Sequence, residues 1–244
     1  MEGPSLVILK EELQHLKGKK LLEIGGNTKV EIKSFKGEIL KGVSSWGKHL
    51  LLSFSSATIR IHFLMFGSYR INERKEEREP RLFLRFKDAE VNFYSCSVKL
   101  ITEGLDEIYD WKVDLMSEKW SEKKVMSLVQ KQANEMVCDV LMDQNIFAGL
   151  GNIIKNEVLY RLHIHPETST GALSRKDQKA LVRESRNYCF EFYEWKKKFE
   201  LKKHWKIFRK RKCPLCKTPC VIKKTGKLQR LSYFCPQCQI ANKV

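Results

Sequence analysis

The stretch DQNIFAGLGNIIKNEVLYR, residues 143–161, decides the fold of this chain. Apolar residues recur at helical spacing on both sides of Gly149-Leu150-Gly151-Asn152, which predicts two helices joined by a tight turn. Glycine permits close backbone approach, and Asn152 can cap a helix that begins at Ile153. Because exposed N–H groups at a helix N-terminus bind anions, this turn is a candidate phosphate site. The alternative is that Asn152 is only an N-cap.

Outward from this turn, the chain divides by hydrophobic pattern. From about Ser121 to Lys203 it reads as helical, in the segments SEKKVMSLVQ, NEMVCDVLM, NIIKNEVLYRL and RKDQKALVRESRNYCFEFYEW. From about Gly25 to Leu105 it favours strands, in the segments KVEIKSF, HLLLSF, ATIRIHFLMF, RLFLRF and EVNFYSCSVKLI. The second pattern predicts a mostly antiparallel sandwich or barrel.

A helix is expected before the strands. Pro4 suits the first helical position, and leucines recur at helical spacing until Gly18. A carboxylate at Glu2 is favoured beside a helix start and an ammonium is not, so the dipole biases the Met1 amine toward its neutral, nucleophilic form. The alternative is an ordinary N-terminal helix with an acidic residue in its cap region. The leucines of this helix are Leu6, Leu9, Leu13 and Leu16.

Two C-x-x-C knuckles occur near the C-terminal end. Cys213-Pro-Leu-Cys216 and Cys235-Pro-Gln-Cys238 are separated by eighteen residues, so that a β-hairpin can bring four thiolates around one zinc ion. We expect a structural zinc, because four thiolates leave no position open for water. A redox pair is the alternative, but it needs neither a second knuckle nor a hairpin. Cys220 is read as a spare, and Cys96, Cys138 and Cys189 as core residues.

The charge predicts a polyanionic partner. Lys and Arg number 46 against 29 Asp and Glu, a formal net charge of +17, which favours nucleic acid first and an anionic membrane surface second. Residues 196–212 alone carry ten basic residues interleaved with Phe199, Trp205 and Phe208. We interpret this run as tracking phosphates, with a solvated helix face as the alternative. The sequence shows neither a spanning apolar stretch nor a signal peptide, so we expect an intracellular protein that binds no membrane.

Taken together, four motifs resemble the formamidopyrimidine-DNA glycosylase and endonuclease VIII family of base-excision repair enzymes. They are Glu2-Gly3-Pro4, Gly47-Lys48-His49-Leu50-Leu51, residues 143–161, and LQRLSYFCPQCQ at 228–239. The resemblance implies an α+β multidomain fold. Its parts would be an N-terminal β-sandwich with a leading helix at 1–115, a helix-two-turn-helix domain at 121–205, and a C-terminal β-hairpin zinc finger at 206–244.

The resemblance also implies the chemistry. The N-terminal amine, here that of Met1, would attack C1′ of the damaged nucleotide and form a Schiff base, after which β,δ-elimination cuts the strand. A terminal amine suits this step because its pKa of about 7.7–8.0, against about 10.4 for lysine, leaves far more of it neutral at pH 7. Glu2 would be the acid that protonates the sugar ring oxygen.

The remaining roles implied by the resemblance concern DNA. Lys48 would bind the phosphate beside the lesion, and Asn152 and Arg230 would bind neighbouring phosphates. Because a damaged base must leave the stack, an apolar side chain must fill its place, and Met65 in Met65-Phe66-Gly67 is the candidate. The alternatives are a solvated turn lysine, a generic finger arginine and a gap-filling core methionine.

One departure from the family concerns the N-terminus. Members normally begin Met-Pro-Glu and lose the methionine, whereas no proline stands between Met1 and Glu2. We expect Met1 to stay before Glu2 and to take the place of the nucleophile, with weakened lyase activity because a primary amine gives an imine that must first be protonated. The alternatives are a catalytically silent binder of lesions and abasic sites, and a proline missing from the sequence. Ser5, where many relatives have an acid, is a smaller departure.

Substrate choice is read from two segments. The oxidised-purine branch of the family has a Gly-rich loop before the finger, but no glycine occurs here from Ala172 to Thr225. FYSCSVKLI, residues 93–101, stands where that branch has an intercalation loop. We therefore expect oxidised pyrimidines as substrates, with ring-opened purines as the alternative.

The expected partner is double-stranded DNA with an oxidised base or an abasic site, bound by a monomer. The expected compartment is the nucleus or the cytoplasm, in a bacterium near the nucleoid. A non-enzymatic DNA-binding zinc protein and an RNA-binding zinc ribbon are the competing classes. Both share the basic charge and the zinc, but neither needs an acid beside the N-terminal amine.

Overall fold

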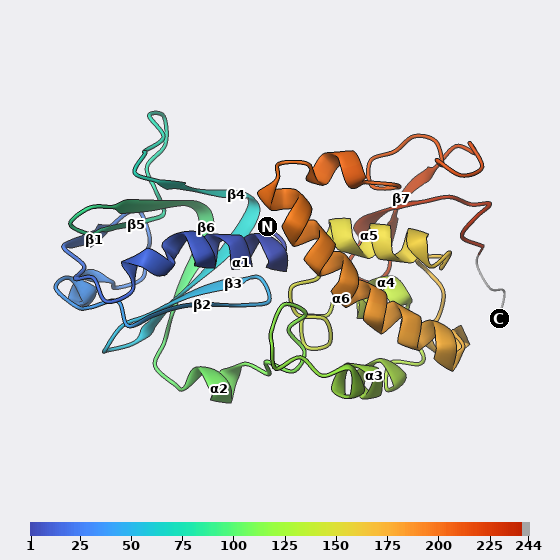
Figure 1. The fold of residues 1–244 in the computed structure, drawn as a ribbon, viewed down its shortest axis with the longest axis horizontal. Helices are drawn as coiled ribbons and strands as arrows, with labels where there is room; N and C mark the ends of the chain where they lie inside the picture. Colours follow the sequence, from blue (N-terminus) through green and yellow to red (C-terminus); the bar gives the residue numbers. More distant parts are fainter. Residues whose placement is uncertain (241–244) are drawn as a thin grey trace. The chain divides into compact units, whose positions relative to one another are not determined.

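The computed structural model describes residues 1–240 (Figure 1). The chain forms two compact units, each with most of its contacts within itself. The first unit comprises Met1 and Ser5–Tyr109. The second comprises Glu2–Pro4 and the chain from Asp110 onward. Within the described part of the chain, no helix is long and apolar enough to cross a membrane.

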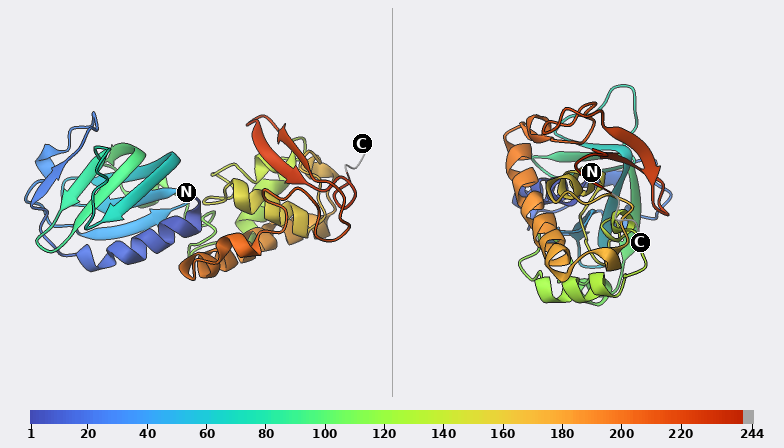
Figure 2. Two further views of the ribbon diagram at one scale, coloured as in Figure 1. Left: turned by 90° about the horizontal axis from the view of Figure 1, so that it is seen from above. Right: turned by 90° about the vertical axis from the view of Figure 1, so that its right-hand side faces the viewer.

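The leading helix of the first unit is present as predicted. Helix α1 spans Gly3–Leu13 and continues as a 3-10 turn, η1, over Gln14–Leu16. Its four leucines are at most 1% exposed and belong to the same apolar core as the sheet. Gly18 follows at a φ of +85°, a conformation that glycine adopts without strain. Figure 2 shows α1 lying along one face of the sheet.

Six strands of the first unit form one antiparallel sheet, in the order β1-β5-β6-β4-β3-β2. Two long strands, β4 and β6, pair with each other at its centre and carry most of the alternating apolar pattern. A bulge interrupts β4 between Phe63 and Ser68. The strands are β1 Glu23–Gly25, β2 Gly42–Trp46, β3 His49–Ser53, β4 Thr58–Ile71, β5 Leu82–Arg85 and β6 Glu90–Ile101.

The sequence pattern failed at one predicted strand. KVEIKSF, residues 29–35, forms no strand but ends in a 3-10 turn, η2, over Lys33–Phe35. Ile32 and Phe35, three residues apart, both enter the core, which is the spacing of a turn rather than of a strand. The short helix α2, Leu105–Ile108, closes the first unit.

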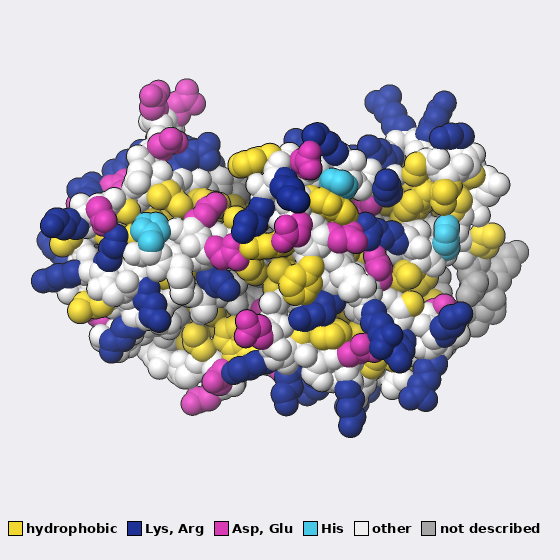
Figure 3. Space-filling model, in the orientation of Figure 1, with side chains coloured by type: hydrophobic (Ala, Val, Ile, Leu, Met, Phe, Trp, Pro, Cys, Tyr) yellow, Lys and Arg dark blue, Asp and Glu magenta, His cyan; other side chains and the backbone are white. Residues whose placement is uncertain are grey.

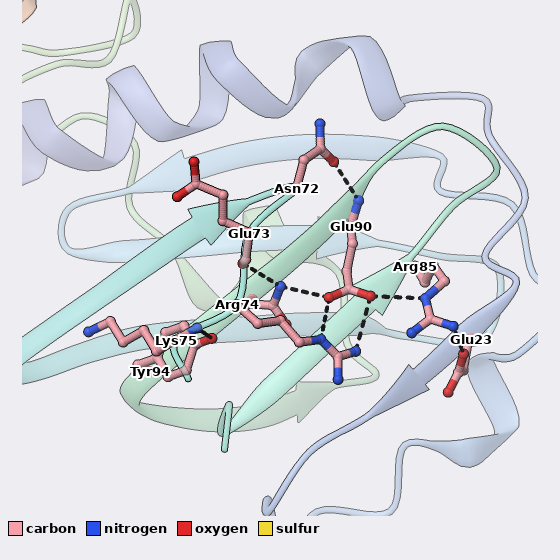
Figure 4. A network of polar contacts seen from close by, with 9 residues as sticks. Glu23, Asn72, Glu73, Arg74, Lys75, Arg85, Glu90 and Tyr94 are labelled. Carbon is pink, nitrogen blue, oxygen red and sulfur yellow. Dashed lines mark hydrogen bonds and ion pairs between the residues drawn. The ribbon is translucent and has the colours of Figure 1, made fainter. Parts of the chain in front are cut away.

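A polar network holds one end of the sheet together (Figure 4). The Glu90 carboxylate accepts hydrogen bonds from Arg74, Arg85 and the Asn92 amide, while the Glu90 N–H donates to Asn72. The guanidinium of Arg74, more than any other neighbour, lowers the pKa of Glu90 to about 2. The network therefore ties the segment after β4 to β5 and β6.

Helices dominate the second unit. Serine side chains cap two of them, since Ser121 Oγ accepts from Lys124 N at 3.3 Å and Ser174 Oγ accepts from Asp177 N at 3.1 Å. Of the predicted segment NEMVCDVLM, only Val137–Val140 is helical, because the chain turns tightly on both sides. The helices are α3 Glu122–Gln130, α4 Val137–Val140, α5 Asn152–Arg161 and α6 Arg175–Lys197, with 3-10 turns η3 at Thr170–Ala172 and η4 at Leu201–His204.

The second unit ends in a hairpin of two strands, β7 Val221–Thr225 and β8 Arg230–Phe234. Helix α5 contacts both α6 and β8, and every residue from Ile154 to Tyr160 is buried. The predicted α+β fold is thereby confirmed, with a leading helix on an N-terminal sheet, a helical domain built around the turn at residues 149–152, and a C-terminal hairpin. The N-terminal strands pair in one continuous sheet, whereas a sandwich or barrel was expected.

Candidate active site and metal centre

The Glu2 carboxylate caps helix α5. Its two oxygens accept hydrogen bonds from Ile153 N at 2.7 Å and from Ile154 N at 3.3 Å. The N-cap residue of this helix is Gly151, which has no side chain to do so. A negative charge at this end is also favoured by the helix dipole. Glu2 is therefore fixed in position by a helix that lies 151 residues away in the sequence.

This arrangement corrects two predictions about Asn152. The helix begins at Asn152 rather than at Ile153, and the Asn152 side chain does not cap it. Its amide instead donates to Leu231 O at 3.0 Å. The amides of Ile153 and Ile154, predicted to be exposed for a phosphate, are engaged by Glu2. A backbone N–H that already holds a carboxylate cannot also hold a phosphate, so the N–H groups of Ile153 and Ile154 are not open to one.

Glycine is required on both sides of this contact. Gly3 N donates to Gly149 O at 2.8 Å, and a Cβ on Gly3 would lie 2.7 Å from the Gly149 Cα. A Cβ on Gly151 would overlap the Glu2 carboxyl group. The close backbone approach predicted for the glycine turn is thus used to seat the first residues of the chain.

Met1 and Lys48 belong to the first unit. The half-buried Met1 packs against the sheet core, and its terminal amine lies close enough to His62 to act on the pKa of that ring. Lys48 lies, as predicted, in the two-residue turn between β2 and β3, where Gly47 takes a φ of +53°. The Lys48 carbonyl lies 3.2 Å from His62 Nδ1.

The surroundings of these two residues are cationic. Burial lowers the pKa of His49 to about 3, and the nearby charges of Arg60 and Lys48 act in the same direction. Burial also lowers the pKa of His62, and the Met1 amine adds to that shift. Both imidazoles are therefore neutral at pH 7, in a region whose fixed charges attract a phosphate group.

Three polar side chains of α5 connect it to strand β8. Asn152 donates to Leu231 O, Lys155 Nζ donates to Ser232 Oγ at 2.8 Å, and Asn156 Oδ1 accepts from Tyr233 N at 2.8 Å. They lie at positions i, i+3 and i+4 of one helix face. Lys155 and Asn156 were not predicted as functional residues, although this spacing of polar residues in a helix otherwise rich in apolar ones was a usable signal.

Two carboxylates bind backbone N–H groups, one in the turn of the hairpin and one in the segment that precedes the finger. Asp139 of α4 accepts from Lys227 N at 2.8 Å and from Leu228 N at 3.3 Å, in the turn just before Arg230. The fully buried Glu157 accepts from the backbone N–H groups of residues 206–208, at 2.7 to 3.0 Å. Arg230 is the first residue of β8, and it is exposed. Neither carboxylate contact could be predicted from the sequence, because the partners are backbone groups.

The four predicted cysteines converge. Their Sγ atoms all lie within 4.8 Å of one another, with Cys213 and Cys238 at 3.8 Å and Cys216 and Cys235 at 3.4 Å. A tetrahedral zinc with Zn–S bonds of about 2.3 Å needs sulfurs about 3.8 Å apart. This donor set could hold a metal such as zinc, and Cys220 is not part of it. Cys96, Cys138 and Cys189 are buried, as predicted.

Met65 was predicted to lie in a turn that follows a strand. It lies instead within strand β4, in the bulge between Phe63 and Ser68. Its side chain is 69% exposed, which excludes the alternative of a gap-filling core residue. Leu64 and Phe66, for which no role was predicted, are 51% and 87% exposed beside it. Phe66 has a φ of +65°. The bulge therefore exposes three successive apolar side chains, those of Leu64, Met65 and Phe66.

Comparison with known proteins agrees with this geometry. A model of the formamidopyrimidine-DNA glycosylase N-terminal domain matches residues 2–97, and a model of the H2TH domain of that enzyme matches residues 113–190. The chain belongs to the formamidopyrimidine-DNA glycosylase and endonuclease VIII family. The resemblance inferred from its four motifs is therefore confirmed.

Relatives within this family include endonuclease 8-like 3 of Mus musculus, 35% identical over 219 residues, and endonuclease 8-like 2 of Mus musculus, 33% identical over 200 residues. These alignments cover 86% and 74% of this chain. The chain spans 36% of the length of the first relative and 57% of the length of the second.

Solved structures share the fold. A viral DNA glycosylase matches with a TM-score of 0.85 at 23% identity, over 98% of this chain and 100% of that one. Lactococcus lactis formamidopyrimidine-DNA glycosylase, in a structure bound non-covalently to DNA containing an AP site, matches with a TM-score of 0.86 at 23% identity and the same coverage.

Proposed function

We propose that this chain is a DNA glycosylase with AP lyase activity that removes oxidised bases, pyrimidines foremost, from double-stranded DNA. The observation that carries the proposal is the seating of Glu2 on the N-terminus of α5. A protein that only binds DNA has no need of a carboxylate fixed next to its N-terminal amine. Membership of the family supports the same reaction class.

In the proposed reaction, the lone pair of the neutral Met1 amine attacks C1′ of the damaged nucleotide. The bond from C1′ to the base breaks, and the base leaves with the electron pair and takes up a proton. The attacking nitrogen becomes positive and gives one of its two protons to the Glu2 carboxylate. Glu2 delivers that proton to O4′ as the C1′–O4′ bond opens, which leaves an iminium whose nitrogen keeps its other hydrogen. The hydrogen bonds to Ile153 and Ile154 hold the carboxylate in place for this transfer.

Strand cleavage follows from the iminium. Its positive charge acidifies the hydrogen on C2′, so loss of that proton expels the 3′ phosphate by β-elimination, and a second elimination expels the 5′ phosphate. The imine of a primary amine must be protonated to act as this electron sink. We therefore expect the Met1 amine to work more slowly than the proline amine usual in the family.

Lys48, Asn152 and Arg230 are proposed to bind the phosphates around the lesion. Lys48 and Arg230 offer cationic groups on a tight turn and at a hairpin tip. Asn152 has two amide hydrogens, of which one is committed to Leu231 O, so a single N–H is left for a phosphate. Met65, exposed on the bulge of β4, is proposed to fill the space of the extruded base.

The metal is proposed to be one structural zinc ion on Cys213, Cys216, Cys235 and Cys238. Four thiolates exclude water from the metal, so it would supply no chemistry to the reaction. It would instead fix the ends of the β7–β8 hairpin, while Asp139 and α5 hold the tip and the length of β8. The position of Arg230 would then depend on the metal.

The preference for pyrimidines is supported by two segments. Residues 93–101 lie within strand β6, where the purine branch has a loop, and only Ser95 among them interrupts the pairing with β4. The segment between α6 and the finger is short and contains η4 in place of a Gly-rich loop. We further propose that the protein acts as a monomer, in the nucleus or, in a bacterium, in the cytoplasm.

The test is a nicking assay on labelled duplexes. One duplex carries an oxidised pyrimidine, one a ring-opened purine, one an abasic site, and one no lesion. The proposal expects cleavage of the first three, fastest at the abasic site and faster for the pyrimidine than for the purine. Tight binding of the abasic duplex without cleavage would contradict it and would support a silent lesion binder, in which the missing proline has abolished the chemistry.

A further inference from the structure

Phe199 has a backbone conformation that normally requires glycine. It follows the last residue of α6, Lys197, by two positions and has a φ of +58°. Phe199 N donates to Lys196 O at 3.1 Å, and Glu200 N donates to Trp195 O at 2.8 Å. These two hydrogen bonds define a Schellman motif, in which the left-handed position is usually glycine because a Cβ is disfavoured there. A phenylalanine at this position calls for a reason other than local stability.

The ring of Phe199 does not contribute to the core. It is 97% exposed, more than any other large apolar side chain in residues 1–240. The loop that carries it is nevertheless well held. The rings of Trp195 and His204 stack at 4.2 Å across the loop, and Lys203 pairs with Glu200 at 2.9 Å. An ordered loop therefore presents an aromatic ring to solvent.

Positive charge surrounds this ring. Between Trp195 and Lys206 the chain carries six lysines and one acid, Glu200, which is already paired with Lys203. All six lysines are exposed. Figure 3 shows basic side chains gathered over the segment that follows α6 and over the β7–β8 hairpin. The six are Lys196, Lys197, Lys198, Lys202, Lys203 and Lys206.

An aromatic ring among lysines matches the chemistry of a single nucleic acid strand. A base stacks on the ring face, and the lysines neutralise the phosphates on either side of that base. A base within a duplex is not accessible for such stacking, because both of its faces are covered. A bilayer or a protein partner would need a wider apolar surface than a single ring.

We propose that Phe199 is a stacking platform for one unpaired nucleobase of a DNA strand, with Lys198 and Lys202 binding the adjacent phosphates. The site adds a contact to single-stranded DNA that the residues of the proposed reaction do not provide. It rests on the proposed function only in taking DNA as the nucleic acid.

The test compares three variants of the full chain with the parent. Fluorescence anisotropy measures the affinity for a labelled single-stranded oligonucleotide and for a blunt duplex of the same sequence. Phe199→Ala and Phe199→Gly are expected to weaken single-strand binding roughly 5- to 100-fold and duplex binding much less. Phe199→Tyr, which keeps the ring, is expected to restore single-strand binding.

The glycine variant separates stacking from folding. Glycine relieves the left-handed backbone, so Phe199→Gly should unfold at the same temperature as the parent or higher while it loses single-strand affinity. A merely structural role of Phe199 would instead lower the unfolding temperature of both small variants. The proposal is overturned if the parent does not bind the single strand, if both small variants bind it like the parent, or if Phe199→Tyr stays as weak as Phe199→Ala.

The nicking assay on an abasic duplex, run on the same proteins, keeps this inference apart from the proposed function. If the variants still nick the duplex and bind the single strand as the parent does, only the proposed stacking site is contradicted. If the parent does not nick the duplex but Phe199→Ala weakens single-strand binding, the proposed lyase activity is contradicted and the stacking site is retained.

Discussion

Glu2 is held more firmly than the second residue of a chain usually is. Chain ends tend to fray, yet two backbone amides of α5 bind the Glu2 carboxylate and Gly3 hydrogen-bonds to Gly149. Catalysis by a positioned acid depends on such fixed geometry, since a displacement of about 1 Å can cost roughly a hundredfold in rate. The contact thus serves the proposed chemistry more than the stability of the fold.

Glu2→Gln is expected to lower the rate of abasic-site cleavage by roughly a hundredfold or more, because the amide cannot deliver a proton. Its effect on folding should be small, about 0.3–1 kcal/mol, because only the interaction of the charge with the helix end is lost. Single-turnover cleavage of an abasic duplex and thermal unfolding measure the two effects.

Two further variants control this result. Glu118→Gln, at an exposed position of the same unit, should cleave like the parent. Gly151→Ala should lose activity with an intact Glu2, because the added Cβ displaces the carboxylate. Cleavage by Glu2→Gln at the parental rate would exclude Glu2 as the proton donor.

Part of this residue-scale picture was predictable. The glycines of the turn at residues 149–152 indicated a close backbone approach, and an acid near a helix start was favoured on electrostatic grounds. The sequence could not identify which helix, because Glu2 lies at the start of α1 but caps α5. Local patterns report local partners, and this contact is a long-range one.

At the scale of elements, α5 organises the second unit. It receives Glu2 at its first turn, and its polar face binds β8 through Asn152, Lys155 and Asn156. Burying a lysine is costly, and burial lowers the pKa of Lys155 from 10.5 to about 8. The carboxylates of Asp139 and Glu2 oppose this shift, and the charge of Arg230 adds to it.

Lys155→Met is expected to change how stability depends on pH. Below pH 8 the folded and unfolded chains both hold this proton, so the folded state bears the full cost of the buried charge. Between pH 8 and 10.5 only the unfolded chain holds it, so the Lys155 contribution to stability rises with pH, by at most roughly 3 kcal/mol. The methionine variant should lack this rise.

Urea unfolding of parent and variant at pH 7, 8, 9 and 10 tests this, with Lys131→Met, an exposed lysine of the same unit, as the control. The unfolding free energy of the parent minus that of Lys155→Met should increase with pH above 8. A constant difference across this range would show that the lysine titrates alike in both states.

The finger gives a second prediction at this scale. Cys216→Ser should lose the bound zinc, because one of four convergent thiolates is removed. Cys220→Ser is the matched control and should keep one zinc ion per chain, since Cys220 lies outside the cluster. Metal analysis of the purified proteins measures both, and full zinc in the first variant or none in the second would rule out the proposed ligand set.

Elements with a strong pattern were predicted well, and short ones were not. The leucines of α1, the long strands β4 and β6, and the twin knuckles all followed from spacing. KVEIKSF was read as a strand, because its apolar residues fit a period of two over part of its length, yet it turns at Lys33–Phe35. Helix α4 is only four residues long, since tertiary contacts rather than propensity fix the turns around it.

At the scale of the whole molecule, the candidate residues divide between the two units. Met1, Lys48 and Met65 belong to the first, whereas Glu2, Asn152, Arg230 and the four cysteines belong to the second. Their order along the chain was enough to identify the family, because each motif is weak alone but their succession is specific. The contact of Glu2 with α5 and the exposure of the Phe199 ring could not be predicted from the order of the motifs, because both depend on tertiary structure.

Reduction of an abasic-site reaction with borohydride is the most direct test of the central claim that the Met1 amine is the nucleophile. Borohydride converts the Schiff base into a stable covalent bond, and peptide mapping then identifies the attached residue. An adduct on the N-terminal amine of Met1, absent from a chain whose N-terminus is acetylated, is the predicted result. An adduct on a lysine side chain such as Lys48, or no adduct on a duplex that the protein binds tightly, would contradict it.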